Sequence, residues 1–230
     1  MMYRYLLNIS YIGTNFRGLQ KNSNHPIPGL KSSIQESIEW AIKEFAPKNE
    51  PKLILSSRTD VGVHALNTAV HIDLESNFGG PYRESFVTTR LNKFFYRENL
   101  AIRIQKTEIV PETFHARFSV KRRIYEYRLA IPKKELPAGS KERFVPIDEL
   151  YRCHFEKIPK FDVHLAKKAA ELIQGTHDFR SFMGTNPETI KKDAFFALRH
   201  IDSISIEPGE TTCHELIKPL AVETYNYFNV

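Results

Sequence analysis

The residues with the clearest chemical potential lie in the stretch 56–65, Ser-Ser-Arg-Thr-Asp-Val-Gly-Val-His-Ala. Asp60 can act as a nucleophile or a base, and the planar fork of Arg58 can hold a phosphate or a carboxylate. Gly62 allows the backbone a positive φ. A plain hairpin turn needs none of these charges. The alternative is an ordinary surface turn closed by an Arg58–Asp60 pair.

The sequence around this stretch predicts that it connects two strands. The apolar run 53–55 precedes it, and the alternating run 69–74 follows it. Upstream, alternation from Tyr3 to Tyr11 predicts a first strand. Ser33 followed by Glu36 is a capping box, and the apolar spacing behind it predicts a helix that Pro47 ends.

Two further elements complete a recognisable order. Gly79-Gly80-Pro81 is a break, after which residues 82–95 are predicted to be helical and residues 101–104 to form a strand. The resulting order, β-α-β-β-α-β, is the split βαβ pattern of ferredoxin-like folds.

The second informative stretch is residues 114–130, in which five cations stand against the single acid Glu126. The cations are Arg117, Lys121, Arg122, Arg123 and Arg128. Tyr125 and Tyr127 lie two apart on the strand expected here and would point to one face. Cations interleaved with aromatics suit RNA, because cations meet phosphates and rings stack on bases. An amphipathic strand with a solvated charged face is the alternative.

The remaining sequence predicts that the second half of the chain has secondary-structure elements of its own. The charged segment 132–159 is expected to be a solvated linker. Asp162 opens a helix that runs to Ile173 and is terminated near Gly175. Strands are expected at 203–206 and around Tyr225 to Phe228.

Composition limits the class of protein. A chain of 230 residues that is 41% hydrophobic is typical of a globular protein, and a net charge of +6 suits a polyanionic partner. Two cysteines argue for a reducing compartment. No apolar run approaches the length of a membrane span, and no targeting peptide is recognisable. We therefore expect a cytoplasmic or mitochondrial protein that does not contact membranes.

Metal and nucleotide cofactors are not expected. Cys153-His154 and Cys213-His214 lack the spacing of zinc ligands. The glycine patterns of dinucleotide and P-loop sites are absent.

Four blocks together resemble one family. Residues 58–65, Arg-Thr-Asp-x-Gly-Val-His-Ala, are similar to the active-site signature of the TruA family of tRNA pseudouridine synthases, and Ser-Ser-Arg-Thr-Asp is most similar to the animal pseudouridine synthase-like subgroup. Residues 11–20, Tyr-x-Gly-x-x-Phe-x-Gly-x-Gln, resemble the family's opening pattern. Residues 114–127 resemble its second motif and residues 175–182 a third block, for which we expect a supporting role.

The resemblance implies an α+β fold in which two ferredoxin-like halves, 1–110 and 111–230, merge their antiparallel sheets. It implies isomerisation of uridine to pseudouridine in tRNA or mRNA without a cofactor or metal. Asp60 would be the catalytic carboxylate, Arg58 would fill the space that the uridine leaves, and Tyr125 would stack on the base. The residues expected to contact RNA are His64, Arg117, Lys121, Arg122 and Arg123.

The C-terminus departs from the family pattern. Family chains continue into a helix with a Val-Arg motif, whose arginine pairs with the catalytic aspartate, whereas this sequence stops at Val230. The second half is therefore expected to be incomplete and activity to be impaired. The alternatives are a weak or inactive RNA-binding form and a basic domain with a protein partner. A homodimer is open as an alternative to a monomer.

Overall fold

A computed structural model describes residues 1–21, 32–138, 146–183, 197–212 and 225–230. The chain divides into two compact units, Met1–Arg123 and Ile124–Val230. Both units combine helices with largely antiparallel sheets, an α+β composition that is compatible with the expected fold.

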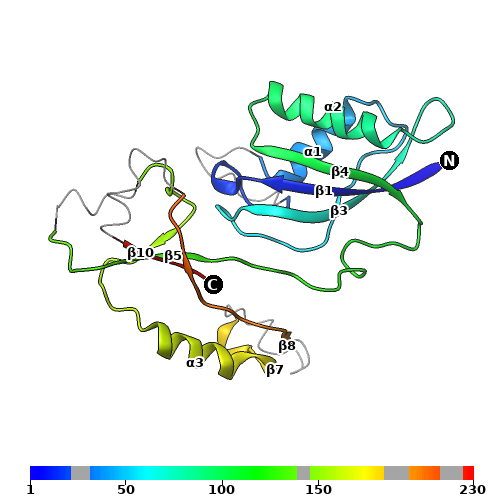
Figure 1. Ribbon diagram of the computed structural model, residues 1–230. Helices are drawn as coiled ribbons and strands as arrows, with labels where there is room; N and C mark the ends of the chain where they lie inside the picture. Colours follow the sequence, from blue (N-terminus) through cyan, green and yellow to red (C-terminus); the bar gives the residue numbers. More distant parts are fainter. Residues whose placement is uncertain (22–31, 139–145, 184–196, 213–224) are drawn as a thin grey trace. The chain divides into compact units, whose positions relative to one another are not determined.

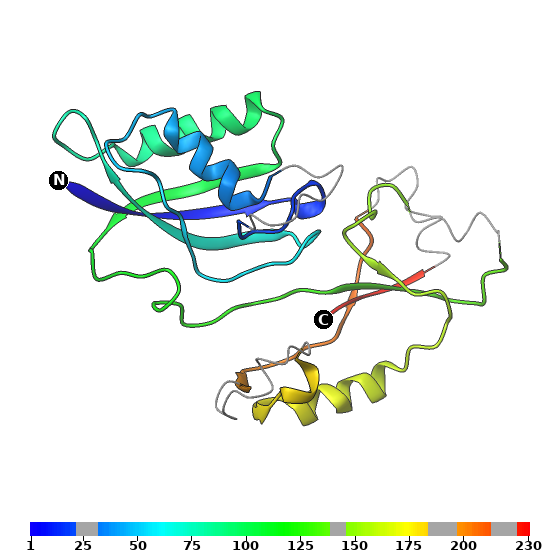
Figure 2. The same ribbon diagram turned by 180° about the vertical axis from the view of Figure 1, so that it is seen from behind.

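Unit 1 has the predicted order β-α-β-β-α-β, so that prediction is confirmed. Its antiparallel sheet has the strand order β2-β3-β1-β4, and α1 and α2 lie on one side of it (Figures 1 and 2). The elements are β1 (Met2–Tyr11), η1 (Gly13–Asn15), α1 (Ile34–Lys43), β2 (Ile54–Leu55), β3 (Ala65–Glu75), α2 (Glu84–Arg97) and β4 (Ile102–Val110).

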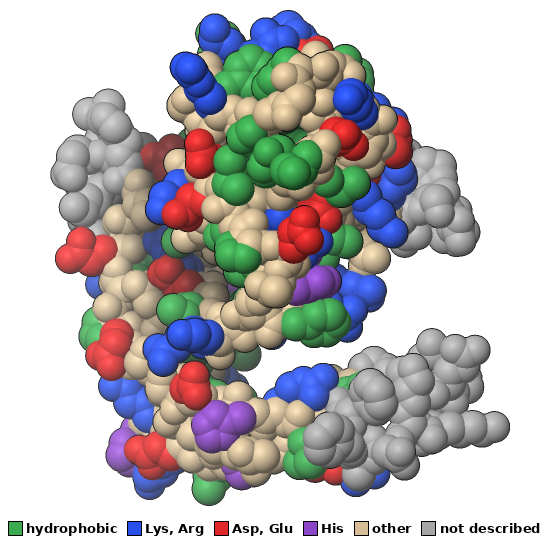
Figure 3. All heavy atoms as spheres, turned by 90° about the vertical axis from the view of Figure 1, so that its right-hand side faces the viewer, with side chains coloured by type: hydrophobic (Ala, Val, Ile, Leu, Met, Phe, Trp, Pro, Cys, Tyr) green, Lys and Arg blue, Asp and Glu red, His purple; other side chains and the backbone are tan. Residues whose placement is uncertain are grey.

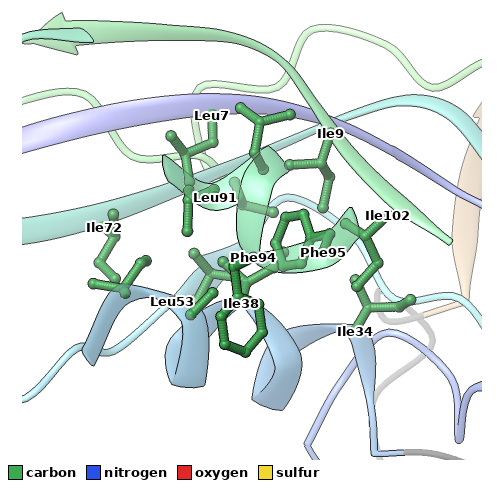
Figure 4. Close-up of a cluster of buried hydrophobic side chains, with 14 of the residues drawn as sticks. Leu7, Ile9, Ile34, Ile38, Leu53, Ile72, Leu91, Phe94, Phe95 and Ile102 are labelled. Atoms are coloured by element: carbon green, nitrogen blue, oxygen red, sulfur yellow. The ribbon is translucent and has the colours of Figure 1, made fainter. Parts of the chain in front are cut away.

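Alternation along the strands creates the core of unit 1. Tyr5, Leu7 and Ile9 of β1 are fully buried, because successive side chains of a strand point to opposite faces and these point toward the helices. The helices contribute matching apolar faces, such as Ile38 of α1 and Phe95 of α2 (Figure 4). The capping box predicted at the start of α1 is present, with both Ser33–Glu36 bonds formed.

Unit 2 contains a four-stranded sheet, β6-β5-β10-β9, and a separate β7-β8 pair. The β5–β6 pair is parallel and the other pairs are antiparallel. Asp162 caps the predicted helix by accepting a bond from the Leu165 N–H at 2.9 Å. The elements are β5 (Arg128–Pro132), β6 (His154–Phe155), α3 (Val163–Ile173), β7 (Gly175–Asp178), η3 (Arg180–Phe182), β8 (Leu198–Ile201), β9 (Glu207–Gly209) and β10 (Tyr225–Asn229).

Two strand predictions need correction. The strand expected within residues 114–130 begins only at Arg128, and residues 120–127 have no regular structure. The strand expected at 203–206 is absent, with strands instead on either side of it, β8 and β9. The physical reason is that β8 pairs with β7 whereas β9 pairs with β10, so the chain between them passes from one sheet to another.

A buried ion pair stabilises unit 2. Arg128 on β5 donates to the fully buried Glu149 carboxylate at 2.6 and 3.2 Å. The same carboxylate accepts bonds from the Thr211 hydroxyl at 2.8 Å and the Thr212 N–H at 2.6 Å. Burial alone would raise the pKa of Glu149, but these donors together lower it below its ordinary value. The carboxylate thus links β5, the turn at 147–150 and the segment before residue 213.

We predict that Glu149→Gln destabilises unit 2 by about 3 kcal/mol, because it leaves the charge of Arg128 without its buried partner. Native-state hydrogen exchange of β5 and β10 amides measures the loss. Glu156→Gln, which removes the exposed His154–Glu156 pair, is the matched control and should change little. Equal exchange in the two variants would contradict the assignment.

Candidate active site

The stretch that contains Asp60 is a loop between β2 and β3, as predicted. It begins at Ser56, whose N–H donates to the Ala69 carbonyl at 3.1 Å, and ends where Ala65 pairs with Tyr11 of β1. Near its middle, the Thr59 hydroxyl lies 2.7 Å from the Tyr11 hydroxyl. The loop is therefore fixed by the ladder at both ends and by β1 between them.

The glycine-rich segment after β1 supports the loop closely. The Gly13 N–H donates to Nδ1 of His64 at 2.9 Å. A Cβ at position 13 would lie 2.0 Å from the Val63 carbonyl oxygen, so only glycine fits there. Leu19 donates its N–H to the Thr59 carbonyl at 3.1 Å. Sequence analysis assigned His64 to RNA contact and missed this support, for which the spacing of glycines at 13 and 18 was the available signal.

Asp60 and Arg58 both lie exposed on this loop. Among the described residues neither side chain forms an ion pair or a hydrogen bond, so the alternative of a turn closed by an Arg58–Asp60 pair does not hold there. Gly62 has the expected positive φ, +84°. The loop thus presents a carboxylate and a guanidinium to solvent from a fixed backbone.

A second segment, residues 111–123, lies on the side of the unit 1 sheet that the helices leave free (Figures 1 and 2). Arg4 holds it there. Its guanidinium forms two 2.7 Å bonds to Asp73 on β3, and also donates to the carbonyls of Phe114, at 2.8 Å, and Glu112. The bonds to Arg4 lower the pKa of Asp73, which keeps the carboxylate charged.

His71 holds the same segment through a neutral ring. It is 2% exposed, and its Nδ1 accepts the Ala116 N–H at 3.0 Å. Burial lowers the pKa of His71 from 6.5 to about 4; the charges of Arg4 and His115 add to this shift, and Asp73 opposes it. Nothing in the sequence separated His71 from an ordinary alternating polar residue of the strand.

A column of rings extends outward from His71. Its ring centroid lies 4.8 Å from that of His115, which lies 4.4 Å from that of Phe118. Phe118 is 76% exposed, and the guanidinium of Arg117 lies 5.7 Å from its ring. An exposed ring beside a cation is a typical surface for stacking a base, although Phe118 was not among the predicted contacts.

The predicted basic residues behave differently from one another. Arg117, Lys121 and Arg122 are exposed. Arg123 is also exposed, but its Nη2 donates to the Ser56 carbonyl at 2.7 Å. On the face of the molecule that Figure 3 shows, Lys and Arg side chains lie among acidic ones rather than in one uniform patch. Tyr125 belongs to unit 2, where it is 60% exposed.

The described ranges contain no group of three or more His, Cys, Asp or Glu side chains that could hold a metal ion. Cys153 and His154 lie within the described residues, whereas Cys213 and His214 lie outside them. None of the helices in the described part of the chain has the length and apolar character needed to cross a membrane.

Similar proteins identify the family. The tRNA pseudouridine synthase A of Limosilactobacillus reuteri (strain DSM 20016) is 34% identical over 216 residues, which are 91% of this chain and 71% of that protein. The chain belongs to the tRNA pseudouridine synthase A (TruA) family. The resemblance found in the sequence is thereby confirmed.

Two further relatives extend the TruA match. The tRNA pseudouridine synthase A of Wolbachia pipientis wMel is 32% identical over 95% of this chain and 78% of that protein. The tRNA pseudouridine synthase-like 1 of Mus musculus is 30% identical over 90% of this chain and 66% of that protein. No family model matches the chain.

We predict that Gly13→Ala displaces the Asp60 loop, because the new methyl group would overlap the Val63 carbonyl. The cost should be about 1–3 kcal/mol, measured by denaturant unfolding. Gly80→Ala is the control, since its Cβ would meet no atom within 4 Å. A Gly13→Ala protein as stable as the Gly80→Ala protein would contradict the close approach.

We also predict that unit 1 loses stability in acid through His71. Its pKa is lowered on folding, so the stabilisation is complete above pH 6.5 and is lost as pH falls from 6.5 to about 4. The full loss should be about 3 kcal/mol. His71→Asn keeps an acceptor near Ala116 without the titration, and should flatten unfolding free energy against pH in this window. An unchanged slope would remove His71 as the cause.

Proposed function

We propose that this protein isomerises uridine to pseudouridine in tRNA. The observation that carries the proposal is the exposed Asp60 carboxylate, without a partner among the described residues, on a loop fixed by β1, β2 and β3. A carboxylate free of internal ion pairs is available to a substrate. The names of the TruA relatives support the same reaction.

The reaction breaks the bond between ribose carbon 1′ and uracil N1 and forms one between carbon 1′ and carbon 5. Carbon 5 loses a proton, and N1 gains one, so atoms balance without an oxidant or a cofactor. Cleavage develops positive charge at carbon 1′, which a carboxylate can stabilise or trap covalently. Asp60 has this role in the proposal, in either form.

The other residues act on the RNA rather than at the bond. A uridine within folded RNA must leave its stack, at a cost of a few kcal/mol. Arg58, on the Asp60 loop, would fill the vacated space, and Tyr125 would stack on the extruded base. Arg117, Lys121 and Arg122 would contact phosphates, and the exposed ring of Phe118 offers a further stacking surface.

The finer fold prediction is also a proposal. The strand order of unit 1, β2-β3-β1-β4, is the split βαβ arrangement and supports a ferredoxin-like first half. A ferredoxin-like second half and a merger of the two sheets remain predictions. The same holds for a homodimer and for the cytoplasmic or mitochondrial compartment.

An RNA-binding protein without catalysis is the second candidate, and the relatives' names favour the synthase over it. The two differ in one measurable quantity, the release of tritium from tRNA labelled at carbon 5 of uridine. A catalyst releases it as the carbon 5 proton leaves, whereas a binding protein does not.

We predict that Asp60→Asn lowers tritium release by a thousandfold or more, on the order of other essential catalytic groups. Its affinity for tRNA should change little, because the basic segment, residues 116–123, is intact. Asp202→Asn, which removes another exposed carboxylate, is the control. Release by Asp60→Asn at the control rate would exclude Asp60 from the chemistry, and no release by the unaltered protein would favour the binding candidate.

A further inference from the structure

The basic segment 116–123 is anchored within unit 1 at two points. At its start, His71 accepts the Ala116 N–H at 3.0 Å. At its end, Arg123 donates to the Ser56 carbonyl at 2.7 Å. The cations Lys121 and Arg122 lie between these anchors. Neither of them has a hydrogen bond or an ion pair among the described residues, so both are available to phosphates.

The acceptor at the second anchor is the first residue of the Asp60 loop. Ser56 is 5% exposed, its N–H is used by the Ala69 carbonyl, and its hydroxyl lies 3.3 Å from that of Thr68. Its carbonyl is thus the remaining polar group at the point where the chain leaves β2. A guanidinium bond to a carbonyl is charge-assisted and directional, which suits it to fix that point.

We propose that Arg123 is a positioning residue, which holds the start of the Asp60 loop through the Ser56 carbonyl. The role rests on the proposed function, in which Asp60 performs the chemistry. RNA bound at Lys121 and Arg122 is then coupled to the loop through a neighbouring residue of the same segment. Arg123 therefore differs from the phosphate contact that the sequence predicted.

A phosphate contact and a positioning role predict different results for a variant of Arg123. A phosphate contact contributes about 0.9 to the slope of log affinity against log salt concentration. A positioning residue contributes little to that slope and instead limits motion of the loop. Because Arg123 is exposed, Arg123→Ala should fold and permit both measurements.

The decisive experiment is hydrogen exchange of the loop amides 57–63 in the RNA-free protein. Arg123→Ala should exchange at least tenfold faster there than the unaltered protein. The matched control is Arg199→Ala, since Arg199 also donates to a backbone carbonyl, that of Leu198, at 2.6 Å but lies on β8 in unit 2. The control should leave loop exchange unchanged.

Tritium release at saturating tRNA and the salt slope complete the test. Arg123→Ala should lower the saturated rate about tenfold and keep the slope, whereas Lys121→Ala, the reference for a phosphate contact, should flatten the slope by about one. Loop exchange at the unaltered level, or a slope flattened as in Lys121→Ala, overturns the inference. Because exchange needs no substrate, it tests Arg123 even if the protein releases no tritium.

Discussion

The antiparallel pairing of β1 with β3 is the constraint on which unit 1 depends. Its register places Tyr5 beside Ile72 on the core face, and Arg4 beside Asp73 on the opposite face. The same register ends with Tyr11 beside Ala65, where the Asp60 loop joins β3. A slip of one residue would turn every side chain of a strand to the other face. The apolar core, the Arg4–Asp73 pair and the position of the Asp60 loop would then all be lost.

The two faces of the unit 1 sheet thus have different roles. One face is apolar and packs on α1 and α2. The other carries Arg4 and His71, whose side chains bind backbone groups of residues 112–116, and Asp73, which pairs with Arg4. A segment without regular structure must find partners for its N–H and C=O groups elsewhere. Here side chains from the strands supply some of them.

Unit 2 uses the same device at a different site. Arg128 and Glu149 bind one another and also the backbone of a loop, through the Glu210 carbonyl and the Thr212 N–H. In both units an Arg–carboxylate pair holds irregular chain against a strand. Such a pair fixes geometry, because the guanidinium is planar and its donors are directed.

The sequence predicted most of unit 1 because each element carries a local signal. The capping box at Ser33 and the alternation of β1 are properties of neighbouring residues, and both appear as predicted. The strand expected within 114–130 failed for the opposite reason. Its residues alternate like a strand, but His71 and Arg123 fasten the segment through side chains rather than through a ladder. His71 lies 45 positions from Ala116, and Ser56 lies 67 positions from Arg123, so no local sequence pattern indicates these bonds.

The candidate site shows the same division. Arg58, Asp60 and Gly62 were visible in the loop sequence, and the positive φ of Gly62 follows from its residue type. The dependence of the loop on Gly13 was not visible, because it arises from a close approach to Val63, 50 residues further along the chain, whose carbonyl oxygen would lie 2.0 Å from a Cβ at position 13. In a sequence, close backbone contact between distant segments is marked only by a glycine, and most glycines occur for other reasons.

The exposure of Asp60 imposes a condition on the bound state. Enclosing a lone carboxylate between protein and substrate is costly unless a cation or hydrogen-bond donors accompany it. Arg58 is on the same fixed loop, two residues away, and in the described structure it is not committed to another carboxylate. It can therefore approach Asp60 or a phosphate once RNA arrives, without breaking an internal ion pair. A loop with a rigid backbone and charged side chains that have no internal ion pair meets this condition. The backbone places Asp60 before binding, and the substrate determines which partner Arg58 takes.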